Sequence, residues 1–135
     1  MSTRRLSDER GSVAVAGMLL SFALSLLIGF GVDVAHAFVV RAQLAAIADA
    51  AALSGAGALD LDAWREGTLA LDPQAALQAA QDELAGDPGL ASSVSADPGA
   101  VSVEVSERLP TFALRLVGIP ALEVSATARA TPETP

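Results

Sequence analysis

One histidine and a nearby aspartate are the residues best suited to acid–base chemistry in this sequence. His36 is the only histidine, and it follows Asp33 by three residues. On a helix this spacing places both side chains on one face, where a carboxylate can orient an imidazole as a general base. A nucleophilic serine would be expected in a Gly-x-Ser-x-Gly turn, and the sequence contains no such turn. The pair therefore indicates a structural or interfacial role, and we predict that the protein is not an enzyme.

The composition excludes several other classes of site. All 8 basic residues are arginines, and the sequence has no lysine, cysteine or tyrosine. A Walker-type phosphate loop and a Schiff-base site both need lysine, and a thiolate nucleophile needs cysteine. The pair Asp60 and Asp62 lacks the glycine-containing ligand loop of a typical calcium site. We therefore expect no metal and no cofactor. The formal net charge of −8 also argues against nucleic acid as a partner.

A long apolar stretch near the N-terminus determines how the rest of the chain must be organised. No charged residue occurs from Ser12 to Val32, a run of 21 positions (32 − 12 + 1). As a helix this run would extend about 31 Å, which matches the hydrocarbon core of a bilayer. The remaining chain is too small to bury a helix that is apolar on all sides. We predict a transmembrane helix over residues 12–35, with the lipid bilayer as the first partner.

Charges on the two sides of the stretch predict its orientation. Arg4, Arg5 and Arg10 precede it, and positive charge favours the cytoplasmic side of a membrane. From Ala58 onward the chain has four arginines and twelve acidic residues, so the whole net charge of −8 (4 − 12) lies there. We predict a cytoplasmic leader over residues 1–11, anchoring in the cytoplasmic (inner) membrane, and an extracytoplasmic C-terminal part whose acidity keeps it soluble.

Small residues recur every four positions inside the apolar stretch, at Gly17, Ser21, Ser25 and Gly29. Small side chains let a second helix approach closely in lipid, where packing drives helix association. The alternative interpretation is that glycine and serine are ordinary components of a membrane helix. We predict that this stripe packs against other membrane subunits.

The helical pattern continues beyond the apolar stretch. Residues 36–57 are rich in alanine and leucine, contain no proline and end at two glycines, Gly55 and Gly57. This extension carries too many polar residues for lipid, so it must pack on the C-terminal part, on another copy or on a partner. Asp33, at the junction, either marks the water boundary or pairs with a cation on an adjacent subunit.

The C-terminal part predicts a small head. The dipeptide Asp72-Pro73 begins a helix that runs to Gly86. Alternating valines predict a strand over residues 101–107, which can pair with 91–96 across the turn at Asp97-Pro98-Gly99. A short helix is expected over residues 110–117, closed by Gly118, and a further strand over residues 122–129.

The predicted fold class is α+β: a long N-terminal transmembrane helix followed by a small head of helices and two to three antiparallel strands. The head would occupy residues 58–130 and leave a flexible tail at 131–135. We expect its thin core to consist of the strand valines and of Leu77, Leu84, Phe112, Leu116 and Leu122.

Several segments resemble a known family. They are Glu9-Arg10-Gly11-Ser12-Val13-Ala14-Val15, Val32-Asp33-Val34, Val40-Arg41-Ala42-Gln43-Leu44 and Ala48-Asp49-Ala50-Ala51-Ala52-Leu53. Together they resemble the N-terminal region of the TadE/TadG-like proteins of the Flp (tight-adherence) pilus machinery. The tail resembles such proteins more weakly, over about residues 109–130. The polar positions that carry the resemblance are Asp33, Arg41, Gln43 and Asp49.

The resemblance implies a single-pass, pilin-like or pseudopilin-like component of a bacterial pilus or related secretion apparatus. Some members are cleaved by a prepilin peptidase after a glycine that follows a short charged leader, which here would be Gly11, leaving Ser12 as the new N-terminus. Pilin-type substrates usually carry glutamate at the fifth mature position, and this chain has Ala16. The uncleaved form is therefore our prediction.

A second cleavage would change the function altogether. Ala35-His36-Ala37 resembles a signal-peptidase site, and cleavage after Ala37 would release a soluble binding domain that begins at Phe38. The apolar run is longer than the usual core of a signal peptide, which favours the anchored form. The secreted domain remains the alternative.

Overall fold

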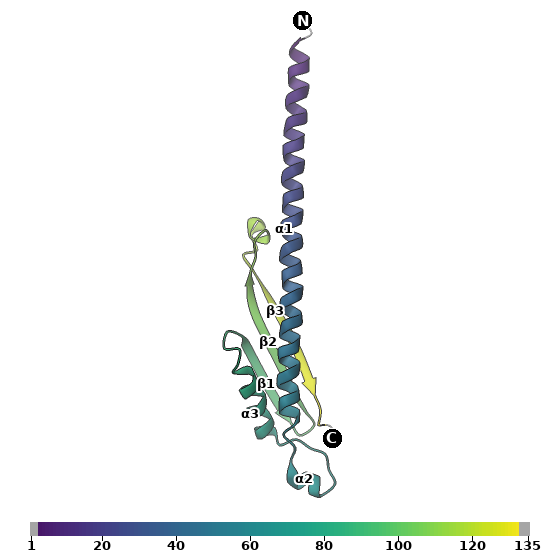
Figure 1. Ribbon diagram of the computed structural model, residues 1–135, viewed down its shortest axis with the longest axis vertical. Coiled ribbons are helices and arrows are strands. Elements are labelled where there is room, and N and C mark those ends of the chain that lie inside the picture. The colour runs from purple at the N-terminus through teal and green to yellow at the C-terminus, as the bar shows by residue number, and fades with distance from the viewer. Residues whose placement is uncertain (1–2, 133–135) are drawn as a thin grey trace. The chain divides into compact units, whose positions relative to one another are not determined.

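The computed structural model describes the backbone of residues 3–132 and the side chains of residues 11–132. Its fold is α+β, as predicted: a long apolar N-terminal helix, short helices and a three-stranded antiparallel sheet (Figure 1). The elements in chain order are α1 (Thr3–Ala56), α2 (Leu61–Arg65), α3 (Pro73–Leu84), β1 (Ala91–Asp97), β2 (Ala100–Pro110), the 3₁₀ helix η1 (Leu114–Val117) and β3 (Ala121–Ala130).

Helix α1 is one uninterrupted element of 54 residues. It begins before the apolar stretch and continues through the predicted extension to Ala56. Alanine and leucine favour the helix throughout, and the glycines inside it do not break it because no proline accompanies them. The helix ends where the backbone N–H of Gly57 bonds to the carbonyls of Leu53 and Ser54.

The chain divides into two compact units. The first comprises Met1–His36 and Pro110–Ala121, and the second comprises Ala37–Leu109 and Leu122–Pro135. The first unit thus contains the apolar part of α1 and the segment between β2 and β3. The second contains the C-terminal part of α1, helices α2 and α3, and nearly all of the sheet.

The sheet has the order β1-β2-β3. Strands β1 and β2 form a hairpin in which Asp97 faces Ala100 and Val94 faces Val103. The Asp97 carboxylate closes the turn by accepting hydrogen bonds from the backbone N–H groups of Gly99 (2.8 Å) and Ala100 (2.9 Å). This is the turn that the Asp-Pro-Gly sequence predicts, because aspartate can bond to the backbone two residues later.

One face of the sheet supplies much of the core of the second unit. Val101, Val103 and Val105 of β2 are fully buried, while Glu104 between them is exposed. Strand β3 repeats the alternation with buried Val124, Ala126 and Ala128. The period of two therefore predicts the buried face of both strands correctly.

Helices cover the core with small side chains. The C-terminal part of α1 contributes Val40, Leu44, Ala48, Ala51 and Ala52, which recur at three- and four-residue spacing. Helix α3, which lies beside β1 (Figure 1), begins at the predicted cap. The Asp72 carboxylate accepts hydrogen bonds from the N–H groups of Gln74 (3.0 Å) and Ala75 (3.2 Å). The buried residues of α3 are Ala76, Ala80 and Leu84.

The prediction that Phe112 and Leu116 belong to the core is wrong. Phe112 and Leu116 are 78% and 70% exposed. The helix expected over residues 110–117 is also shorter, because β2 extends to Pro110 and only Leu114–Val117 form a 3₁₀ turn. Gly118 closes this turn with a φ of 91°, a left-handed conformation that favours glycine. Leu77 and Leu122 are half-buried, and Leu84 is buried as expected.

The close approach of α1 to its neighbours gives a first test. A Cβ atom at Gly55 would lie 2.9 Å from the carbonyl oxygen of Ala76 and 3.1 Å from both methyl groups of Val101. We expect Gly55→Ala to destabilise the second unit by about 1–3 kcal/mol, because the backbone of α3 must shift. Hydrogen exchange of the β2 amides in the full chain in detergent measures this.

Gly57→Ala is the matched control for Gly55→Ala. A Cβ atom at Gly57 would meet its nearest atom, the carbonyl oxygen of Ser54, at the ordinary distance of 3.4 Å. Similar acceleration of exchange in both variants would show that helix ending, and not close packing, requires glycine at position 55.

Candidate functional site

The apolar part of α1 fits a membrane span. The helix from Gly11 is long and apolar enough to cross a bilayer, and its most apolar window is not buried in the structure. Large side chains such as Met18, Leu20 and Ile28 are mostly exposed. An unburied apolar surface of this length is unfavourable in water and favourable in lipid. This surface indicates membrane anchoring of the chain.

Asp33 lies one residue beyond the uncharged run, and it is the one buried acidic residue among the described side chains. Only 8% of its surface is exposed. Its oxygen Oδ1 accepts a hydrogen bond from the backbone N–H of Phe112 (2.8 Å). Its oxygen Oδ2 accepts from the N–H groups of Ala113 (2.8 Å) and Leu114 (2.9 Å). The carboxylate thus attaches the β2–β3 segment to α1 by three charge-assisted hydrogen bonds.

The local conformation of the β2–β3 segment aims these donors at Asp33. The turn η1 starts at Leu114, so the N–H groups at its N-terminal end have no partners inside the turn. Its cap residue, Ala113, has no side-chain acceptor, and Asp33 supplies the acceptor from another element. The segment is closed at its base, where the N–H of Thr111 bonds to the carbonyl of Pro120 (3.1 Å) and its hydroxyl bonds to the carbonyl of Ile119.

Gly29 completes the attachment one turn before Asp33. A Cβ atom at Gly29 would lie 2.6 Å from the Cβ atom of Ala113, which is closer than such atoms approach. Glycine at this position therefore lets the segment lie directly on the helix. Gly29 also belongs to the predicted stripe of small residues, so its open side is occupied by the chain itself.

The other members of the stripe have different surroundings. A Cβ atom at Gly17 would meet no described atom within 4 Å. Ser21 and Ser25 are exposed, and their hydroxyls donate to the carbonyls four residues earlier, Gly17 and Ser21, at 2.9 Å each. These bonds satisfy the hydroxyls within the helix, so that only small side chains project from this side of it. Packing of this stripe on a second helix stays a prediction.

The remaining polar positions that carry the family resemblance are on the surface. Arg41, Gln43 and Asp49 are all exposed on α1 in the second unit. The structure brings none of these three side chains to Asp33. Gly11 is exposed and helical, whereas the side chains of the predicted leader before it lie outside the described residues. Cleavage between Gly11 and Ser12 stays a prediction.

The acid–base pair suggested by the spacing has no catalytic geometry. His36 is exposed, and both carboxylate oxygens of Asp33 already accept backbone N–H groups. Asp60 caps α2 by accepting from the N–H groups of Asp62 (2.9 Å) and Ala63 (3.2 Å), and the Asp62 carboxylate pairs with Arg65 (2.6 Å). No cluster of three metal-ligating side chains occurs among the described residues.

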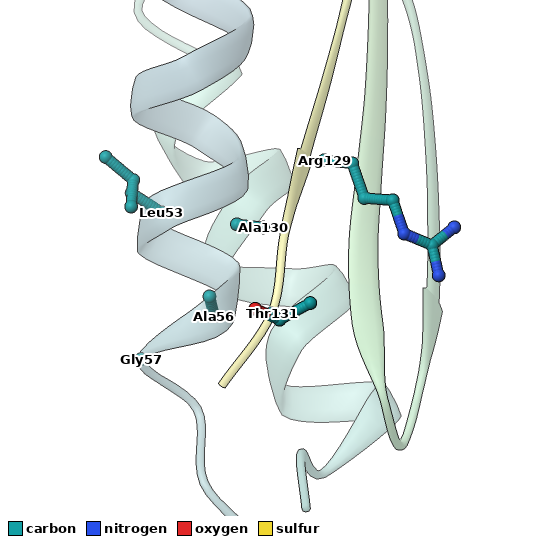
Figure 2. Close-up of a pocket in the computed structure, with 6 residues that line it drawn as sticks. All are labelled: Leu53, Ala56, Gly57, Arg129, Ala130 and Thr131. Atoms are coloured by element: carbon teal, nitrogen blue, oxygen red, sulfur yellow. The ribbon is translucent and has the colours of Figure 1, made fainter. Parts of the chain in front are cut away.

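A pocket in the second unit also lacks a set of catalytic side chains. It lies between the C-terminal end of α1 and the end of β3, and is lined by Leu53, Ala56, Gly57, Arg129, Ala130 and Thr131 (Figure 2). Figure 2 shows that the Arg129 side chain points away from α1, so its guanidinium does not enter the pocket. What remains is one leucine, two alanines, backbone and the Thr131 hydroxyl, with no base among them to activate that hydroxyl.

Removing one acceptor from the Asp33 site gives a second test. Asparagine at position 33 keeps the shape of the side chain but has one oxygen and no charge. We expect Asp33→Asn to weaken the attachment of residues 112–114 by about 1.5–3 kcal/mol, the range for a hydrogen bond to a charged group. Hydrogen exchange of these three amides in the full chain in detergent would accelerate accordingly.

Asp49→Asn is the control for Asp33→Asn, because Asp49 is an exposed aspartate on the same helix. It should leave the exchange of residues 112–114 unchanged. Equal protection of these amides in the wild type and in Asp33→Asn would contradict the assigned role of the carboxylate.

Comparison with known proteins finds a similarity in the helical region. A family model described as "Putative Flp pilus-assembly TadE/G-like" matches residues 11–58. No curated protein and no solved structure matches the chain. The matched region contains the apolar span, Asp33 and the exposed positions Arg41, Gln43 and Asp49, and it ends just after α1. The resemblance of the N-terminal segments is thereby confirmed: residues 11–58 are similar to the TadE/G-like family of Flp pilus assembly.

Proposed function

We propose that the protein is a single-pass, pilin-like structural component in the assembly of a Flp-type pilus or a related secretion apparatus. The observation that carries this proposal is the coincidence of the family match with an unburied apolar helix of membrane-spanning length. In this arrangement the N-terminus is cytoplasmic and the acidic C-terminal part is extracytoplasmic, as the flanking charges favour. The protein acts by holding and presenting a folded domain, not by catalysis.

Two interactions would serve this function. In the membrane, the surface at Gly17, Ser21 and Ser25 packs on the helices of other pilin-like or pilus-assembly subunits. Outside, the exposed polar side chains Arg41 and Asp49 are available for contacts with subunits. Neither interaction needs a bound cofactor.

The uncleaved chain is the form that we propose. Ala16 occupies the position where pilin-type substrates carry glutamate, so processing after Gly11 is disfavoured. The competing site Ala35-His36-Ala37 lies inside continuous helix α1, whereas a signal peptidase needs an extended substrate. Release of a soluble domain beginning at Phe38 is therefore the weaker alternative.

Intact mass spectrometry of the protein purified from membranes tests this proposal. We expect the mass of residues 1–135 in the membrane fraction, because neither cleavage site is favourable. A chain beginning at Ser12 would show prepilin-type processing and overturn the uncleaved form alone. A chain beginning at Phe38 in the culture fluid would overturn membrane anchoring and the structural role together.

Association through the small-residue surface gives a separate prediction. We expect Gly17→Ile to weaken self-association about tenfold, or about 1.4 kcal/mol, because a branched side chain separates the helices. Energy transfer between donor- and acceptor-labelled copies in lipid vesicles measures the dissociation constant.

Ala23→Ile is the matched control for Gly17→Ile. Ala23 is also exposed in the span, and helical geometry places it on a face roughly opposite Ser21 and Ser25, the other two residues of the packing surface. It should leave the dissociation constant unchanged. Equal weakening by both substitutions would mean that the stripe has no special part in association.

A further inference from the structure

The segment that Asp33 attaches to α1 exposes an unusual number of large apolar side chains. We call residues 112–119 the Asp33-bound turn. Phe112 and Leu116 are the two most exposed, and Val117 and Ile119 are 57% and 42% exposed. Isolated exposed apolar residues are common, but four within eight positions of one turn form a patch that water disfavours.

The depth of the Asp33-bound turn along α1 follows from its contacts. Ala113 lies against Gly29, which is inside the uncharged run that ends at Val32. Asp33, one residue past the end of that run, binds the amides of residues 112–114. Both contacts belong to the same compact unit as the apolar helix. If this run crosses the bilayer, the turn lies at the level of the last helical turn within the lipid.

Six backbone N–H groups of the turn have partners, as an apolar environment requires. Irregular backbone is costly in lipid because each unpaired N–H or carbonyl loses its bonds to water. Here the three N–H groups at the start of the turn bind Asp33, as described above. Those of Leu116, Gly118 and Ile119 bind the carbonyls of Ala113 (3.0 Å), Arg115 (3.2 Å) and Leu114 (3.0 Å).

We propose that the Asp33-bound turn inserts its apolar side chains into the outer leaflet of the bilayer beside α1. The chain then contacts the membrane at two places: through the span and through this turn. The inference goes beyond the single-pass role and rests on the proposed topology, in which residues 12–35 cross the bilayer. The occupant is a lipid surface because the patch is continuous with the lipid-facing surface of the helix to which it is attached.

Arg115 fits this placement. Its side chain is exposed and sits between the apolar residues Leu114 and Leu116. Arginine at a membrane interface extends its apolar stem along the lipid and places its guanidinium among the head groups. The phosphate groups of phospholipids are its natural partners there. An exposed arginine among exposed apolar residues matches the chemistry of this boundary.

Single-cysteine labelling of the full chain tests the proposal, since the sequence has no cysteine. Leu116→Cys carries an environment-sensitive fluorophore in vesicles of phosphatidylethanolamine and phosphatidylglycerol. Leu19→Cys, in the span, and Ser92→Cys, exposed on β1, are the controls for lipid and water. Quenching is measured with a nitroxide on the lipid acyl chain and with iodide in the water on both sides.

We expect the label at position 116 to lose intensity to the lipid nitroxide, as the Leu19 label does, and to resist iodide. Quenching by iodide to the level of the Ser92 label would overturn the proposal while the Leu19 label still reports the span. Protection from both quenchers would also overturn it, because a protein surface would then cover the turn. Absence of lipid quenching at Leu19 would overturn the span and the turn together.

A second label guards against damage by the first substitution. Val117→Cys sits next to position 116 on the same exposed turn and should give the same result. Combining Leu116→Cys with Asp33→Asn should reduce the lipid quenching, because the turn is then held less firmly at the depth of Gly29. Unchanged quenching in the combined variant would contradict the part assigned to Asp33 in this placement.

Discussion

A carboxylate at the end of an apolar helix is stable only if it keeps its water or acquires donors that replace the water. Asp33 has acquired donors: three backbone N–H groups from residues 112–114. This exchange satisfies both partners, because the same three groups would otherwise have no acceptor at the start of η1. Glycine at position 29 permits this bonding, because a side chain there would collide with Ala113 and keep the N–H groups away from the carboxylate.

Close approach of backbones is also the rule in the second unit. Its core is built largely from valine and alanine, and α1 contributes three alanines to it, Ala48, Ala51 and Ala52. Such side chains bury little area each, so the stability of this unit must come from dense packing. Gly55 marks the tightest point, where α1 lies against both Ala76 and Val101. The core of this unit therefore packs closely against the part of α1 whose buried side chains are mostly alanine.

Much of this architecture could be predicted from the sequence because it depends on local patterns. The alternation of valines fixes the buried face of β2, the Asp72-Pro73 pair fixes the start of α3, and the uncharged run marks the part of α1 that is long and apolar enough to cross a membrane. The partner of Asp33 could not be predicted, because backbone N–H groups some 80 positions away leave no side-chain signature. The same gap led to the wrong assignment of Phe112 and Leu116 to the core. Hydrophobicity alone does not distinguish an apolar side chain in the core from one that is exposed.

The separation between Asp33 and its donors, 79 to 81 residues, also orders the events of biogenesis. A ribosome adds residues one by one from the N-terminus, so the helix bearing Asp33 is complete long before Phe112 is translated. In the proposed topology, the carboxylate must remain hydrated at the bilayer surface until the β2–β3 segment has been synthesised and translocated. In that topology the burial of Asp33 is a late step, which follows the arrival of residues 112–114 on the outer side.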